Sequence, residues 1–107
     1  MRALYEVVIE VHEVRGRCAA GYRKGDRFSV DGFLLKGDRI CIHALAGMIS
    51  LLSPFSHGVS ARALGIGSSD DEGYVQCPDP GTPFTCGGTV VFRLKRVKSS
   101  RTADLGE

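Results

Sequence analysis

The sequence lacks a long unbroken apolar run, which argues against a membrane-spanning helix. Its longest apolar stretch, residues 40–52, is interrupted by His43, Gly47 and Ser50. A membrane-spanning helix needs roughly 20 apolar residues, so this stretch predicts a core helix and no membrane association. The first ten residues alternate in polarity and include acidic side chains. A signal peptide has an apolar core instead, so we expect a cytoplasmic protein.

The sequence also lacks a strong charge of either sign. Fourteen Lys and Arg residues against 12 Asp and Glu residues give a net charge of +2 at neutral pH, and the basic excess is local, at residues 93–101. A short basic run of this kind is usually a solvated strand end, so we expect no nucleic-acid partner. With 43% hydrophobic and 24% charged residues, the composition is that of a folded globular protein.

Hydrophobic periodicity predicts an α+β fold. Polarity alternates with period two in residues 4–14, 27–30 and 89–97, and shorter strands are expected at 33–35 and 74–77. Residues 39–53 have apolar side chains at helical spacing, with Asp38 expected to cap the start and Pro54 to follow the end. We therefore expect a small, mainly antiparallel sheet packed against one main apolar helix. The side chains expected to face the core are Tyr5, Val7, Ile9, Val11, Phe28, Val30, Val90, Phe92 and Leu94.

The domain organisation predicted from this pattern is simple. Residues 1–97 are expected to form one domain, because the chain is too short for two independent cores. Residues 98–107 show no apolar pattern and are expected to be a flexible tail. The apolar arc of the helix is broader than one sheet face normally covers, which favours a homodimer that covers the rest.

The four cysteines, at positions 18, 41, 77 and 86, include no C-x-x-C pair of the kind that marks zinc ribbons or thioredoxin-type redox sites. A metal site would have to be assembled from distant segments. Cys41 is interpreted as a small hydrophobic residue of the helix. Cys18 follows Arg15 and Arg17, and nearby cations favour a reactive thiolate, so Cys18 is the candidate nucleophile, with His12 as a conceivable partner.

Three segments occur in an order that resembles a known family. They are GRCAAGYRKGDRF at residues 16–28, Cys41 at the start of the apolar helix, and CPDP at residues 77–80 shortly before VVF. Together they resemble a family of small, uncharacterised prokaryotic proteins with a G-x-C-x-x-G-[HY]-K/R-x-G-D-x-F segment and a C-P-D-P turn followed by a V-V-F strand. The shared positions are Gly16, Cys18, Gly21, Gly25, Asp26, Phe28, Cys41, Cys77, Pro78, Asp79 and Pro80.

The resemblance covers residues 3–97 and marks these positions without assigning a reaction to them. The chain departs from the family in two places. It has LLSPFSHG where family members have an aromatic segment with a tryptophan, and Cys86 lies in an additional stretch before the last strand. Any ligand contact that the aromatic segment makes in the family is therefore in doubt for this chain.

Three functions remain open from the sequence. The first is a binding or accessory module in which Cys18, Cys41 and Cys77 converge, either to hold a soft metal such as zinc or iron or simply to pack together. The second is a thiol-dependent enzyme or redox protein that uses Cys18. The third is a structural homodimer. We favour the non-enzymatic module, with its small-molecule ligand unknown. Pro78 and Pro80 then form a rigid link into the last strand, and Cys77 is the thiol to test.

Overall fold

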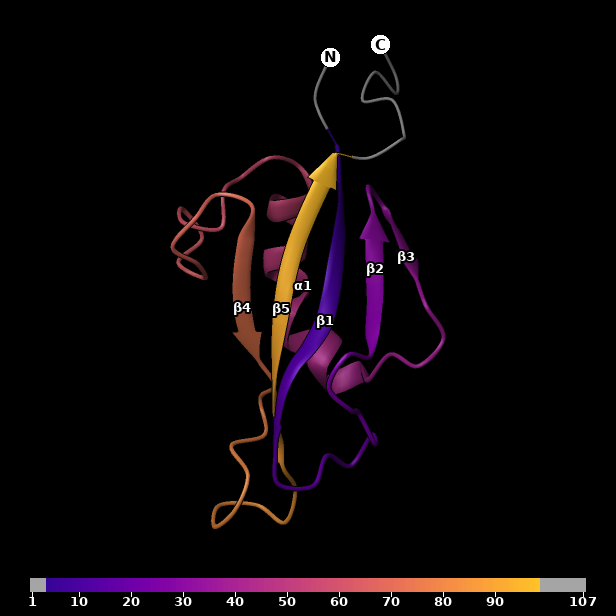
Figure 1. The fold of residues 1–107 in the computed structure, drawn as a ribbon, viewed down its shortest axis with the longest axis vertical. Helices are drawn as coiled ribbons and strands as arrows, with labels where there is room; N and C mark the ends of the chain where they lie inside the picture. The colour runs from indigo at the N-terminus through magenta and orange to yellow at the C-terminus, as the bar shows by residue number, and fades with distance from the viewer. Residues whose placement is uncertain (1–3, 99–107) are drawn as a thin grey trace.

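A computed structural model describes residues 4–98 as a five-stranded sheet with one helix packed on one of its faces (Figure 1). The elements in chain order are β1 (Tyr5–Arg15), β2 (Arg27–Asp31), β3 (Leu34–Lys36), α1 (Ile42–Ser56), β4 (Glu72–Gln76) and β5 (Thr89–Lys98). The strand order is β3-β2-β1-β5-β4, and all neighbouring strands are antiparallel. The predicted α+β fold is confirmed.

Two further sequence predictions concern the C-terminal tail and membrane-spanning helices. The tail predicted at 98–107 lies outside the described residues, except for Lys98, which is the last residue of β5. No helix within residues 4–98 is long and apolar enough to cross a membrane.

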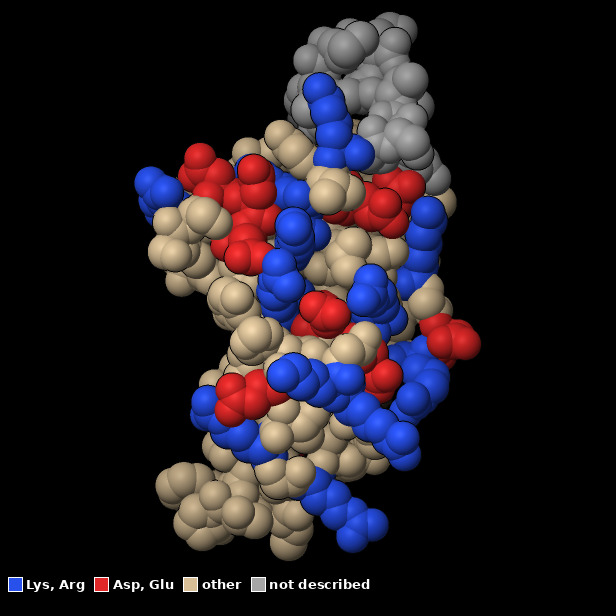
Figure 2. Space-filling view, in the orientation of Figure 1, with Lys and Arg blue, Asp and Glu red and all other residues tan. Residues whose placement is uncertain are grey.

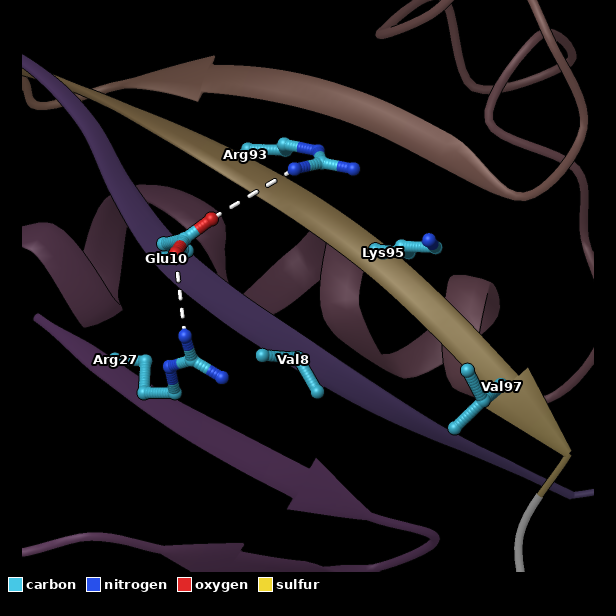
Figure 3. Close-up of a pocket in the computed structure, with 6 residues that line it drawn as sticks. All are labelled: Val8, Glu10, Arg27, Arg93, Lys95 and Val97. Atoms are coloured by element: carbon cyan, nitrogen blue, oxygen red, sulfur yellow. Dashed lines mark hydrogen bonds and ion pairs between the residues drawn. The ribbon is translucent and has the colours of Figure 1, made fainter. Parts of the chain in front are cut away.

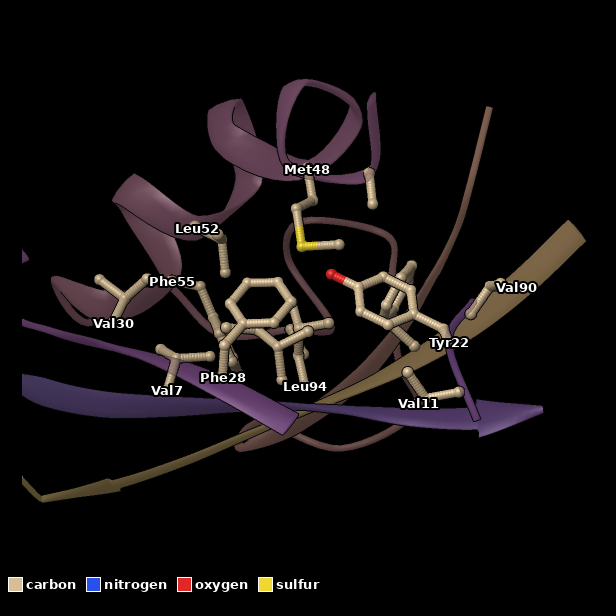
Figure 4. Packing of buried hydrophobic residues seen from close by; sticks show 14 residues of the cluster. Val7, Val11, Tyr22, Phe28, Val30, Met48, Leu52, Phe55, Val90 and Leu94 are labelled. Carbon is tan, nitrogen blue, oxygen red and sulfur yellow. The ribbon is translucent and has the colours of Figure 1, made fainter. Parts of the chain in front are cut away.

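The core lies between α1 and the face of the sheet that α1 covers, here called the inner face (Figure 4). Alternation along β1 places Val7, Ile9 and Val11 on this face, where each is at most 2% exposed. The register pairs Ile9 with Phe28 of β2 and with Leu94 of β5, so β1, β2 and β5 contribute to the same layer. The buried residues that complete the layer from α1 are Ala44, Met48, Leu52 and Phe55. The predicted inward-facing residues are confirmed.

The predicted helix bounds, 39–53, are wrong at both ends. The helix begins at Ile42 with Cys41 as its N-cap, and it continues through Pro54 to Ser56. Asp38 does not cap it, because the backbone of Cys41, just before the helix, is extended, and the Cys41 amide donates a hydrogen bond to the Tyr22 hydroxyl. At the other end, complete burial of the last two helical residues stabilises a turn that proline alone would have ended.

Arg96 is a buried cation on the inner face of β5. Its guanidinium lies 4.4 Å from the centre of the Tyr5 ring and 4.7 Å from the centre of the Phe55 ring. Nη1 donates to the carbonyls of Phe55 and Val59, each at 2.8 Å, and Nε donates to Asp71 Oδ1 at 2.9 Å. These bonds tie the C-terminal end of α1 and the segment that follows it to the sheet.

Part of the apolar surface of α1 remains uncovered among the described residues. Ile42 is 74% exposed and Ile49 is 51% exposed. No Asp, Glu, Lys or Arg occurs between Ile42 and Ser56. The helix therefore has one apolar face against the sheet and a second, uncharged face toward solvent.

Candidate functional site: a cysteine pocket at the start of α1

Three segments that are far apart in the sequence enclose a pocket at the N-terminal end of α1. The β1–β2 connection and the β4–β5 connection both lie at the end of the sheet where the helix begins (Figure 1). The pocket has a volume of about 390 Å³. Its lining consists of Cys18, Ala19 and Ala20 from the first connection, the N-cap Cys41 and His43 at the start of α1, and Cys77, Pro78, Asp79, Pro80, Thr85 and Gly88 from the second connection.

Glycines allow the two connections to approach each other closely. Gly16 has a φ of 76°, and a side chain there would lie 3.2 Å from Gly88 Cα. A side chain at Gly88 would overlap the backbone of Arg15 and Arg17. The backbones of the two connections are therefore packed directly against each other, which only glycine permits.

Gly47 plays a similar role on the helix side. A Cβ at this position would lie 3.3 Å from Pro78 Cδ, which is a tight contact. The absence of a side chain in the second turn of α1 lets the CPDP turn rest on the helix. This contact places Cys77 beside the helix start that carries Cys41.

Tyr22 and Arg39 fasten the first connection to the segment before the helix. The buried Tyr22 hydroxyl accepts from the Cys41 amide at 2.7 Å and donates to the Arg39 carbonyl at 2.8 Å. Burial raises the pKa of Tyr22, against the opposing effect of the Cys41 amide. Arg39 Nη2 donates to the Ala20 carbonyl at 3.2 Å. Cys41 and the chain next to Cys18 are thus held by two separate contacts.

Asp79 shapes the opposite wall of the pocket. Its carboxylate accepts hydrogen bonds from the Thr85 hydroxyl and, at 2.8 Å, from the Gly81 amide. These two bonds hold the pKa of Asp79 below its usual value, and the bond from Thr85 has the larger effect. The Asp79 amide donates to Cys77 Sγ at 3.5 Å. Because Pro78 has no amide proton, Asp79 provides the first backbone donor after Cys77.

The cysteines predicted to converge do line one pocket. Cys18, Cys41 and Cys77 are all half-buried, packed against the core and free of disulfides. Cys86 is exposed and does not line the pocket, although it belongs to the same connection as Cys77. The structure therefore places Cys18, Cys41 and Cys77 at one pocket and Cys86 outside it.

The other motif residues position the pocket rather than line it. Gly21 and Gly25 have φ values of 76° and 97°, which favour glycine in the first connection. Asp26 Oδ2 accepts the Arg23 amide at 2.9 Å, which closes a turn of that connection. Phe28 lies in the core, with its ring centre 6.5 Å from that of Phe92.

Two histidines lie in different places relative to the pocket. His43 is exposed and lines the same pocket as Cys41. His12 lies on the other side of the sheet, with its ring centre 5.2 Å from that of Tyr74. His12 is not among the pocket residues, so the structure does not support its pairing with Cys18.

The described residues show no preformed site for the metal that the sequence suggested. Among residues 4–98, no three His, Cys, Asp or Glu side chains are arranged to hold a metal ion. A zinc or iron ion held by Cys18, Cys41 and Cys77 would therefore require at least some of these side chains to change rotamer on binding.

Two contributors to the pocket escaped the sequence interpretation. Tyr22 lay within the recognised motif, but its bond to Cys41 joins residues 19 positions apart. Thr85 is placed by its bond to Asp79, six residues earlier. A threonine in a proline-rich stretch gives no sequence signal for such a contact.

The chain matches no family model, no curated protein and no solved structure, so the family resemblance stays a prediction and the pocket is interpreted from its own residues.

Proposed function

We propose that this protein is a non-enzymatic binding module whose cysteine pocket takes a soft ligand, meaning one with a thiophilic centre. The observation that carries the proposal is that Cys18, Cys41 and Cys77, from three separate segments, line one pocket. Soft centres prefer thiolate ligands to the oxygen ligands that hard cations prefer. A cytoplasmic location, which stays a prediction, would keep such thiols reduced.

The pocket walls suit a ligand with a small apolar body as well as a soft centre. Ala19, Ala20, Pro78 and Pro80 provide apolar surface beside the thiols. Small-molecule sites typically combine mostly apolar walls with a few polar groups that orient the ligand. Here His43, Asp79 and Thr85 provide the polar groups.

A binding role is favoured over a thiol enzyme because no activating base is engaged. A nucleophilic cysteine normally forms a hydrogen bond with an adjacent base such as histidine. Among the described residues, no hydrogen bond joins a histidine to Cys18, Cys41 or Cys77. Zinc and iron remain members of the proposed ligand class, subject to the rotamer changes that the geometry requires.

Phenylarsine oxide is a direct probe of this proposal. Its arsenic–oxygen bond is replaced by two arsenic–sulfur bonds, and the oxygen leaves as water with the two thiol protons. We expect reduced protein to form one adduct per chain, detected by intact mass. The Cys86→Ser variant should form the same adduct, because Cys86 is outside the pocket. The double variant Cys18→Ser/Cys77→Ser leaves one pocket thiol and should lose the adduct.

Two results of the phenylarsine oxide experiment would overturn the proposal. No adduct on the wild-type chain, or loss of the adduct in Cys86→Ser, would show that the pocket thiols do not act together. A parallel titration with cobalt(II) tests the metal members of the class. One bound cobalt with sulfur-to-metal charge-transfer absorption would identify a soft metal as the ligand, and absence of that absorption would remove metals from the class.

A second candidate function is a structural homodimer through α1. The specific observation in its favour is the uncharged outer face of the helix, with Ile42 and Ile49 both more than half exposed. Exposed apolar patches of this kind often mark interaction sites. Sedimentation of the wild-type chain and of Ile49→Lys tests it. A dimer that Ile49→Lys dissociates supports the candidate, and a wild-type monomer at high concentration excludes it.

A further inference from the structure

The face of the sheet opposite α1, here called the outer face, has a charge pattern that the cysteine pocket does not explain. The helix lies behind the sheet in Figure 1, so this face is open toward the viewer. Figure 2 shows Lys and Arg side chains across its middle, with Asp and Glu among them. The outer-face residues come from alternate positions of β1, β2 and β5.

Most charges on the outer face are already paired. Glu10 of β1 lies between Arg27 of β2 and Arg93 of β5, at 3.3 and 3.7 Å respectively (Figure 3). Arg93 also binds Glu72 of β4, with Nε 2.6 Å from Oε2. Two arginines and two carboxylates therefore form one chain of ion pairs across four strands.

Lys95 is left outside this chain. In the strand register it lies directly opposite Glu72 on β4 and opposite Val8 on β1. The Glu72 carboxylate binds Arg93 instead, and valine offers no charge. Among residues 4–98, no carboxylate lies within ion-pair distance of Lys95, whose side chain is exposed.

The unpaired lysine lines a hollow of about 350 Å³. The hollow is lined by Val8, Glu10, Arg27, Arg93, Lys95 and Val97 (Figure 3). Of its three cations, Arg27 and Arg93 are paired with Glu10 and Glu72, which leaves the positive charge of Lys95 unpaired. Val8 and Val97 provide apolar surface on the same side as the Lys95 side chain, so the hollow has both an anion-attracting part and an apolar part.

We propose that this hollow binds a small organic anion, a phosphate ester or carboxylate, whose charged group pairs with Lys95 and whose apolar body lies on Val8 and Val97. Lys95 is suited to this role because binding the ligand breaks no existing ion pair. Arg27, which is 66% exposed, can approach the same anion while Glu10 remains paired with Arg93.

The same pattern disfavours a long polyanion. Glu10 and Glu72 alternate with the cations across the outer face. A nucleic-acid backbone would therefore pass over carboxylates as well as cations, and its phosphates would be repelled there. A ligand with one anionic group avoids this repulsion because its charge can lie beside Lys95 without passing over Glu10 or Glu72.

Binding of phenyl phosphate, followed by amide NMR shifts in full-length protein, tests the proposal. We expect saturable shifts in β1 and β5 around Val8, Lys95 and Val97. Lys95→Gln should weaken binding about fivefold, the effect of losing roughly 1 kcal/mol. Lys24→Gln, an equal change in net charge at an exposed lysine of the β1–β2 connection, is the matched control and should bind like the wild type.

Three outcomes would overturn the proposal. Equal weakening by Lys95→Gln and Lys24→Gln would show a general charge effect. Inorganic phosphate binding as tightly as phenyl phosphate would exclude a role for the two valines. A short oligothymidylate that binds this face more tightly than phenyl phosphate would assign it to nucleic acid.

Discussion

Replacing Arg96 by methionine tests how the end of α1 is joined to the sheet. Methionine keeps an apolar stem between the Tyr5 and Phe55 rings but removes the guanidinium that donates to the carbonyls of Phe55 and Val59. The Val59 carbonyl then loses this donor, and the Phe55 carbonyl keeps only the longer bond from the Gly58 amide, at 3.3 Å. Arg96 is only 4% exposed, so water does not readily replace it.

The expected loss is about 3 kcal/mol in the free energy of unfolding. Hydrogen bonds to charged groups contribute about 1.5–3 kcal/mol each, and part of that gain is offset by the cost of burying the guanidinium. The pairing with Asp71 adds little, because Asp71 is 67% exposed. Asp71→Asn should therefore cost less than about 1 kcal/mol.

Urea denaturation at neutral pH measures both variants against the wild type. The midpoint should fall markedly for Arg96→Met and little for Asp71→Asn, without a change in the slope of the transition. If Arg96→Met were within about 1 kcal/mol of the wild type, or no worse than Asp71→Asn, the two carbonyl bonds would not be what holds the helix end.

Three further predictions concern the pocket. Tyr22→Phe should lower the free energy of unfolding, measured in urea, by about 1–2 kcal/mol. Burial raises the pKa of Tyr22 above its usual 10.0, so the contribution of Tyr22 to stability should be complete below pH 10.0 and should be lost as pH rises through the pKa of the folded state. Tyr22→Phe should remove this alkaline loss of stability. For Asp79, the lowered pKa means that its contribution is present above pH 3.8 and lost as pH falls through the lower folded value. An NMR acid titration should show the Gly81 amide signal shifting below that pH in the wild type and not in Asp79→Asn. Gly47→Val should push Pro78 away from α1 and weaken the phenylarsine oxide adduct in competition with ethanedithiol, and an unchanged adduct would refute that contact's role.

The strands were predictable because alternation is a local property that the sheet preserves. Val90, Phe92 and Leu94 face the core as their spacing indicates. The same alternation places Arg96 on the inner face, but its position in a basic run indicated a solvated side chain. Its burial depends on carbonyls from a different element, which no local pattern predicts.

The helix bounds and the pocket geometry were harder to predict because they depend on distant contacts. Asp38 is an ordinary capping residue by sequence, yet the start of the helix is set by the Tyr22 hydroxyl. The grouping of Cys18, Cys41 and Cys77 followed from motif order. The enclosing contacts, such as Gly47 against Pro78, appear only in three dimensions.

The cysteine pocket takes one thiol from each of three segments that span most of the chain. In an unfolded chain these thiols are far apart, because 58 residues separate positions 18 and 77. They line one pocket only where the two connections and the start of α1 come together in the folded chain. A reagent that needs two thiols at once therefore distinguishes folded from unfolded chains. Any ligand that bridges these thiols would bind the folded chain and stabilise the whole fold against unfolding.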